Sequence, residues 1–227
     1  MLILAIDTST MISTVTIADE NEIIGDFNVN QQKTHSESMV PMIETLLELL
    51  GMEIADIDKF VIAKGPGSFT GLRIGMTIAK TLAQVYKKDL IPISTLLALA
   101  NNSSSDRVKV PMIDARGNRV YGAAYDKDFN ELIKEDLYII DDFSRKVNEL
   151  GQSVELIGTM NEKYGDRFDR AISLPINFNN SIGRSLIKIA LEGDLVGEDL
   201  YTIKPNYLRK SQAERQLIEN DKKDGNK

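Results

Sequence analysis

Apolar residues with a period of two open the chain, and a helical period follows after about residue 34. Residues 2–6 form a short apolar run, residues 13–17 alternate polar with β-branched side chains, and residues 23–29 continue that pattern. The polar residues 7–9 separate the first two runs. The pattern therefore predicts three consecutive strands with a turn after the first.

Helices and buried strands are predicted to follow. Thr34 and Glu37 match a capping box, and Gly51 is a natural helix end. A glycine-rich stretch, GPGSFTG over residues 65–71, leads into a second helix. The predicted elements are a helix over 36–50, a strand over 60–63, a helix reaching residue 86, a strand over 90–93 and a short helix from residue 95.

The second half of the chain repeats this order. Strands are predicted over 108–113, 120–125 and 132–140, then a helix capped by Asp141 to about residue 150, a strand over 154–157 and a helix over 181–191. Both halves read βββαβα, and residues 6–7 align with residues 113–114 at the first turn of each half. Internal duplication of this kind determines the architecture.

Two facing βββαβα lobes predict a duplicated α/β fold of the actin-like type, which is ribonuclease H-like in each lobe and is shared with sugar kinases and Hsp70. We expect residues 1–103 to form the N-terminal lobe and residues 104–210 the C-terminal lobe. Residues 101–106 are polar and are expected to link them. Residues 211–227 are polar and are expected to form a mobile tail.

Composition narrows the function classes. The 227 residues contain no cysteine, so there is no thiolate metal site or nucleophile. The apolar start of the chain is too short for a signal peptide or a membrane span, which favours a cytoplasmic protein. Lys+Arg number 27 and Asp+Glu 34, a formal net charge of -7. Because nucleic-acid binding rests on cations, any role on RNA is expected to come through a partner.

The turn Asp7–Thr8–Ser9–Thr10 lies where actin-like ATPases hold phosphate and metal. Asp7 there would position Mg²⁺; alternatively, the turn satisfies only its own backbone. Glycine is favoured in nucleotide-binding turns, but Ser9 stands here, and Ala115 and Arg116 precede Gly117 in the second half. Nucleotide hydrolysis is therefore disfavoured, and we expect no cofactor.

His35 is the single histidine. A two-histidine metal site requires imidazoles one helical turn apart, and the position one turn on is Met39, a poor ligand for hard metals. The sequence thus predicts no metal site and no catalytic residue, and His35 with Glu37 is expected to belong to the first turn of a helix. Metallopeptidase and ATPase or kinase activity are the rival hypotheses.

Two helices carry the features expected of a helix-on-helix partner interface. Gly71, Gly75, Ala79 and Ala83 recur every four residues, a small-residue stripe that allows another helix to approach closely. The helix over 36–50 is apolar around about half its circumference, more than a core-facing stripe requires. The predicted interface residues are Met39, Ile43, Leu46, Leu50, Gly71, Gly75, Ala79 and Ala83. The alternative is that the stripe packs against the sheet of its own lobe.

Motifs along most of the chain resemble those of the TsaB family. They are Asp7–Thr8–Ser9, His35–Ser36–Glu37, GPGSFTGLRIG over 65–75, Asp114–Ala115–Arg116 and PNYLR over 205–209. The resemblance implies a bacterial accessory protein for threonylcarbamoyladenosine in tRNA, an inactive paralogue of TsaD that is also labelled M22 glycopeptidase-like. It implies pairing with TsaD through N-terminal-lobe helices, with the ATPase TsaE joining and tRNA reached only through the complex.

The main hypothesis is therefore a non-catalytic subunit that activates a TsaD-like catalytic subunit for threonylcarbamoyl transfer to the adenosine next to the anticodon. Alone, the chain is expected to form a homodimer through the same apolar face. The sequence gives Tyr207, Arg209 and Glu214 no role beyond fastening the C-terminal segment to the body.

Overall fold

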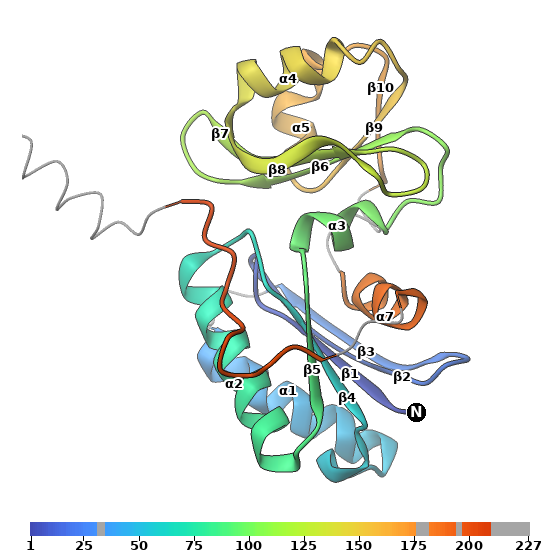
Figure 1. Ribbon diagram of the computed structural model, residues 1–227, viewed down its shortest axis with the longest axis vertical. Coiled ribbons are helices and arrows are strands. Elements are labelled where there is room, and N and C mark those ends of the chain that lie inside the picture. The colour runs from blue at the N-terminus through green and yellow to red at the C-terminus, as the bar shows by residue number, and fades with distance from the viewer. Residues whose placement is uncertain (31–34, 176–181, 194–196, 210–227) are drawn as a thin grey trace, which may run out of the picture.

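Two lobes, each built on a five-stranded sheet, are stacked one above the other in the computed structural model (Figure 1). The structure describes residues 1–30, 35–175, 182–193 and 197–209. The first sheet contains β1 (Ile3–Asp7), β2 (Ile12–Ala18), β3 (Ile23–Asn30), β4 (Lys59–Ala63) and β5 (Asp89–Ile93). The second contains β6 (Val108–Asp114), β7 (Arg119–Tyr125), β8 (Glu131–Ile139), β9 (Val154–Ile157) and β10 (Ala171–Ser173).

The two sheets have the same topology. Their strand orders are β3-β2-β1-β4-β5 and, read from the opposite edge, β8-β7-β6-β9-β10. In each sheet the first three strands pair antiparallel. The fourth strand pairs parallel to the first, and the fifth pairs parallel to the fourth. This repetition is the duplicated actin-like α/β fold, and the predicted fold class is confirmed.

Strand β1 is buried along its whole length because both faces of the first sheet are covered. Its side chains alternate between two cores, as the period of two requires. Leu4 and Ile6 pack toward α1 (His35–Leu50) and α2 (Phe69–Tyr86), whereas Ile3 and Ala5 belong to a core shared with the second lobe. The strand therefore joins the two hydrophobic cores of the molecule.

Helices α1 and α2 lie together on one face of the first sheet (Figure 1). Helix α1 ends where it was predicted to end, because Gly51 adopts a φ of 65° that favours glycine. Ser68 caps α2 by accepting a hydrogen bond from the Gly71 amide at 3.3 Å. The capping box predicted for Thr34 lies outside the described residues.

The two lobes exchange helices. Helix α3 (Thr95–Ala100) follows the last strand of the first sheet but packs on β6 and β7 of the second. Helix α7 (Gly183–Glu192) comes from the second half but packs on the first sheet, chiefly β1 and β2. The helix predicted over 181–191, in the second half of the chain, therefore covers the first sheet and not the sheet of its own half.

Smaller differences concern local signals. The N-cap of α4 (Ile140–Asn148) is Ile139, so Asp141 lies in the first helical turn and was wrongly predicted to be the cap. The helix between β9 and β10 is the short α5 (Asn161–Tyr164), which the sequence pattern did not show. The pattern also missed β10 and the 3₁₀ turns η1 (Ile54–Asp56) and η2 (Gly165–Arg167).

The described C-terminal segment, residues 197–209, returns along the first lobe (Figure 1). The Glu198 amide donates to the Leu90 carbonyl at 3.1 Å, and the Asn206 amide donates to the Lys64 carbonyl at 2.6 Å. Ile203 is buried in the core beneath α1 and α2. The division into residues 1–103 and 104–210 stays a prediction, and the tail over 211–227 lies outside the described residues.

Candidate functional site

A cleft of about 830 Å³ opens where the two lobes meet. Equivalent turns of the two lobes line it. The Asp7 carboxylate accepts a hydrogen bond from the Ser9 amide at 2.7 Å, and the Asp114 carboxylate accepts one from the Arg116 amide at 2.8 Å. The duplication inferred from the sequence therefore extends to the hydrogen bonds of its first turns.

The Asp7 turn is closed against α2. Asp7 is 2% exposed and Ser9 1% exposed, and burial raises the pKa of the Asp7 carboxyl, an effect that the hydrogen bond from the Ser9 amide opposes. The Ser9 carbonyl accepts a hydrogen bond from the Ser68 amide at 2.7 Å. A magnesium–phosphate group requires a charged, accessible carboxylate and open backbone amides. The turn fits such a group poorly, because the carboxylate is 2% exposed and bonded to the Ser9 amide, although Asp7 and Ser9 both line the cleft.

The small-residue stripe of α2 faces this turn. A Cβ atom on Gly71 would lie 2.0 Å from the Thr8 carbonyl oxygen, and one on Gly75 would lie 2.3 Å from Thr8 Oγ1. The Thr8 hydroxyl also donates to the Gly71 carbonyl at 2.7 Å. The glycines are therefore needed for the close approach of α2 to the end of β1.

All eight predicted interface residues pack inside the first lobe. Ala79 and Ala83 are fully buried next to the glycines, and Leu50 is partly buried. Met39, Ile43 and Leu46 of α1 join the same core. The helix-on-helix contact that these residues make is between α1 and α2 of this chain. The eight residues are thus largely buried within this chain, and their part in partner binding stays a prediction.

Comparison with known proteins identifies the family. A family model described as TsaD, tRNA N6-adenosine threonylcarbamoyltransferase, matches residues 22–180. A tRNA threonylcarbamoyladenosine biosynthesis protein TsaB from Bacillus subtilis (strain 168) is 32% identical over 98% of this chain and 100% of its own length. The chain belongs to the TsaB family. The match to the TsaD model fits a paralogue of TsaD.

Other relatives agree. TsaB from Escherichia coli (strain K12) is 36% identical over 57% of each chain. A crystal structure from Pseudomonas aeruginosa, described as an uncharacterized protein with similarity to peptidase YEAZ, has a TM-score of 0.78 at 23% identity. It covers 92% of this chain and 99% of its own. This structural likeness supports the fold.

His35 of this TsaB-family chain is occupied by local hydrogen bonds. Its Nδ1 lies 2.7 Å from Ser13 Oγ, and its Nε2 lies 2.9 Å from the Thr10 carbonyl oxygen. A carbonyl only accepts, so Nε2 carries the proton and Nδ1 accepts from the serine. Ser13 is 3% exposed, which leaves no approach for a substrate to this serine–histidine pair. Among the described residues, no cluster of three histidine or acidic side chains is arranged to hold a metal ion.

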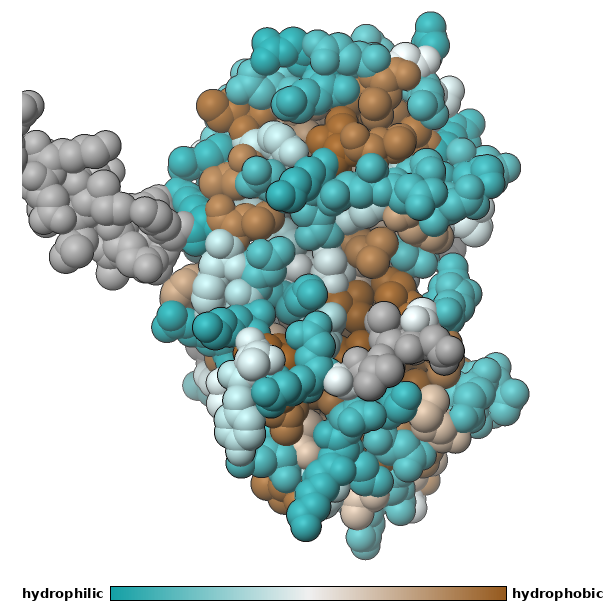
Figure 2. Space-filling view, viewed as in Figure 1, coloured by the Kyte–Doolittle hydropathy of each residue, from teal (hydrophilic) through white to brown (hydrophobic). Residues whose placement is uncertain are grey.

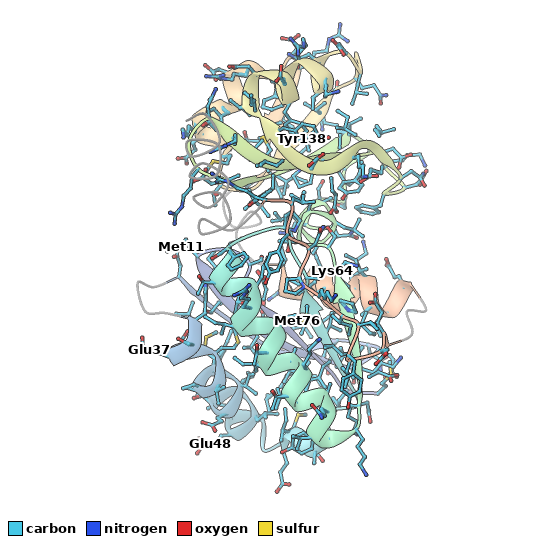
Figure 3. All side chains as sticks on the ribbon, turned by 60° about the vertical axis from the view of Figure 1, so that its left-hand side comes forward. Met11, Glu37, Glu48, Lys64, Met76 and Tyr138 are labelled. Atoms are coloured by element: carbon cyan, nitrogen blue, oxygen red, sulfur yellow. The ribbon has the colours of Figure 1, made fainter. Side chains whose placement is uncertain are left out.

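The outer face of the α1–α2 layer carries other residues than those predicted. Arg73, Thr77, Thr81 and Val85 recur every four residues on α2 and are exposed. On α1, Val40 is 44% exposed and Leu49 is 70% exposed; nine positions separate them, so they lie on opposite flanks of that helix. Figure 3 shows Glu37 and Glu48 pointing outward at the two ends of α1. On α2 the sequence does mark this face: each of its residues follows a member of the small-residue stripe by two positions, which is more than half a turn around the helix.

Contacts between the lobes were also missed. Glu135 of β8 accepts hydrogen bonds from Ser94, which caps α3, and from Tyr125 of β7, the latter at 2.6 Å. Arg209 donates to the Ala115 carbonyl in the second-lobe turn. Hydrophobic side chains gather along the boundary between the lobes on the face shown in Figure 2. The polar side chains that make these hydrogen bonds, Ser94, Glu135 and Arg209, are far from one another in the sequence, so no local pattern predicts the contacts.

Tyr207 fastens the C-terminal segment to α2. Its hydroxyl accepts a hydrogen bond from Arg73 Nε at 3.0 Å, and its ring centroid lies 4.6 Å from that of Phe69. Arg209 extends the same segment to the second lobe. Glu214 lies outside the described residues. Every helix of the described part of the chain is too short or too polar to span a bilayer.

Proposed function

We propose that this chain is a non-catalytic subunit required for threonylcarbamoyl transfer to the tRNA adenosine next to the anticodon. In this role it binds and activates a TsaD-like catalytic subunit, and a TsaE-like ATPase joins the complex. Membership of a family named for threonylcarbamoyladenosine biosynthesis supports a place in this pathway. The finer role rests on the surface of the first lobe.

The observation that carries the proposal is the outer face of α1 and α2. Val40 and Leu49 on opposite flanks of α1, and Val85 on α2, expose 44%, 70% and 66% of their surfaces, although both helices already bury an apolar face. Exposed apolar side chains spaced over two adjacent helices fit a helical partner surface. The partner is therefore bound by the side of the layer that faces away from the sheet.

A scaffold role agrees with the chemistry of the cleft. The carboxylate that a phosphate-handling enzyme would present to a metal is buried at Asp7 and held by the Ser9 amide. The net charge of -7 supports contact with tRNA through the partner rather than by this chain alone. Transfer chemistry then belongs to the catalytic subunit.

The test is threonylcarbamoyl transfer to unmodified tRNA by the TsaD-like and TsaE-like proteins with ATP and threonylcarbamoyl-adenylate. We expect activity with the wild type and a loss of about 10-fold or more with Leu49→Glu/Val85→Glu, because two charges would be buried at the interface. Gly75→Leu is unsuitable as an interface variant, because even a Cβ atom at residue 75 would clash with Thr8 and disturb the fold.

Ile172→Glu is the matched control, because Ile172 is 41% exposed on β10 of the other lobe. It should retain full activity. Full transfer without any of this chain would overturn the proposed role. Equal losses of transfer activity in the control and the double variant would show that the interface is not on α1 and α2.

A further inference from the structure

Arg73 is held by two side-chain contacts although it lies on the surface. Its guanidinium carbon lies 4.0 Å from the centroid of the Phe69 ring, and its Nε donates to the Tyr207 hydroxyl at 3.0 Å. Stacking on an aromatic face together with one hydrogen bond fixes a side chain that otherwise has several rotatable bonds. The entropy lost when a ligand binds such a side chain is already partly removed.

The two terminal nitrogens of Arg73 point to no partner in the described part of the chain. No described carboxylate lies within ion-pair distance of them, whereas Arg145, Arg167 and Arg184 each pair with an aspartate. Arg73 begins the exposed series that continues through Thr77, Thr81 and Val85. The free side of the guanidinium therefore belongs to the outer face of α2.

The charges of this face are segregated between its two helices. Helix α1 contains exposed Glu37, Glu44 and Glu48 and neither lysine nor arginine. Helix α2 contains Arg73 and Lys80 and no acidic residue. A partner that complements this pattern places cations opposite α1 and carboxylates opposite the start of α2.

We propose that Arg73 is the ionic anchor of the partner interface, and that its preorganised guanidinium binds an aspartate or glutamate carboxylate of the catalytic subunit. This inference rests on the proposed function. The planar fork matches the two oxygens of a carboxylate, which an ammonium group cannot match. Tyr207 acts as a positioning residue, because it contacts Arg73 and orients it.

The experiment measures the affinity of the full chain for the TsaD-like subunit by titration calorimetry. Arg73→Met keeps the apolar stem over Phe69 and removes the fork. We expect its dissociation constant to rise roughly 10- to 100-fold, as for other arginine anchors. Arg145→Met removes the same charge from α4 in the other lobe, where Arg145 pairs with Asp142, and should leave the affinity unchanged.

Two further variants separate geometry from charge. Arg73→Lys keeps the charge and should still lose roughly 10-fold in affinity, because a lysine makes no bidentate contact. Tyr207→Phe keeps the ring beside Phe69 and should lose less, on the order of 3-fold, from one hydrogen bond. Because Tyr207 acts only through Arg73, its effect should vanish in the Arg73→Met background.

The possible outcomes distinguish failure of the Arg73 anchor from failure of the proposed function. Wild-type affinity in Arg73→Met, with binding lost in Leu49→Glu/Val85→Glu, overturns the anchor and leaves the interface standing. No measurable binding by the wild type overturns the proposed function itself. Unchanged affinity for the subunit with weaker tRNA retention by the complex would assign the guanidinium to phosphate and overturn the carboxylate proposal.

Discussion

Single residues in the first turn decide what the cleft can do. Asp7 and Asp114 occupy equivalent turns, yet Asp7 is 2% exposed whereas Asp114 is exposed. The difference arises because α2 approaches the Asp7 turn through Gly71, whereas in the described part of the second lobe the helix that follows β9 is only the four-residue α5. Duplicated sequence has thus produced one buried and one exposed carboxyl.

The buried carboxyl predicts a pH dependence of stability. Burial raises the pKa of Asp7 above its ordinary value of 3.8, so the folded chain binds this proton more tightly than the unfolded chain. The resulting stability is present at low pH and is lost as the pH rises from about 4 through the folded pKa. Asp7→Asn keeps the acceptor for the Ser9 amide and should become the more stable protein at neutral pH.

The measurement is urea unfolding at a series of pH values. Asp114→Asn is the matched control, because it makes the same change at the exposed equivalent turn. A wild-type protein that gains stability relative to Asp7→Asn as the pH rises would show that Asp7 is charged and stabilised in the folded state.

At the scale of elements, the exchanged helices hold the lobes together. Helix α7 approaches β2 at Gly183, where a Cβ atom would lie 1.9 Å from Thr16 Oγ1 and 2.6 Å from Thr14 Cγ2. Thr16 cannot yield easily, since its hydroxyl donates to the Asp26 carboxylate at 2.8 Å. The start of α7 is therefore as closely fitted to β2 as α2 is to β1.

Gly183→Val should displace α7 from the first sheet. We expect a loss of about 1–3 kcal/mol in the free energy of unfolding, as for other overpacked sites, and faster amide hydrogen exchange in α7. Arg184→Ala is the control, since the Arg184 side chain that pairs with Asp26 is itself 71% exposed, and its removal should cost less than about 1 kcal/mol. Unchanged exchange in Gly183→Val would show that the helix is not docked as described.

The elements themselves were largely predictable, and their partners were not. Alternation over residues 13–17 and Gly51 at a helix end are local signals, and the structure follows them in β2 and α1. The direction of the glycine stripe was not predictable, because small residues suit a sheet and a partner helix equally well. Only the position of Thr8 beneath Gly71 and Gly75 decides it. The exchange of α3 and α7 likewise depends on tertiary contacts.

At the scale of the whole molecule, one hydrophobic core crosses the lobe boundary. It combines Ile3 and Ile91 of the first sheet with Ile113 and Ile157 of the second, and Leu186 of α7 lies in the same cluster. Cores shared in this way couple the unfolding of the parts that contribute to them. The two lobes are therefore expected to unfold together despite their separate sheets.

Scanning calorimetry tests this coupling. We expect one transition in which the calorimetric and van't Hoff enthalpies agree. Leu186→Ala, at a fully buried position, should move that whole transition to lower temperature, with a loss of about 2–5 kcal/mol. Two resolved transitions, only one of them shifted by the substitution, would show that the lobes unfold independently.

The exchange of helices also sets the order in which the protein can be completed during synthesis. The face of the first sheet that carries Ile3 and Ala5 is finished only by α7, which begins at Gly183. Until that helix has emerged from the ribosome, the first sheet of the nascent chain has one uncovered apolar face. Chaperones bind surfaces of this kind. Neither lobe can complete its fold alone, because the first sheet is covered only after the second half of the chain has been synthesised.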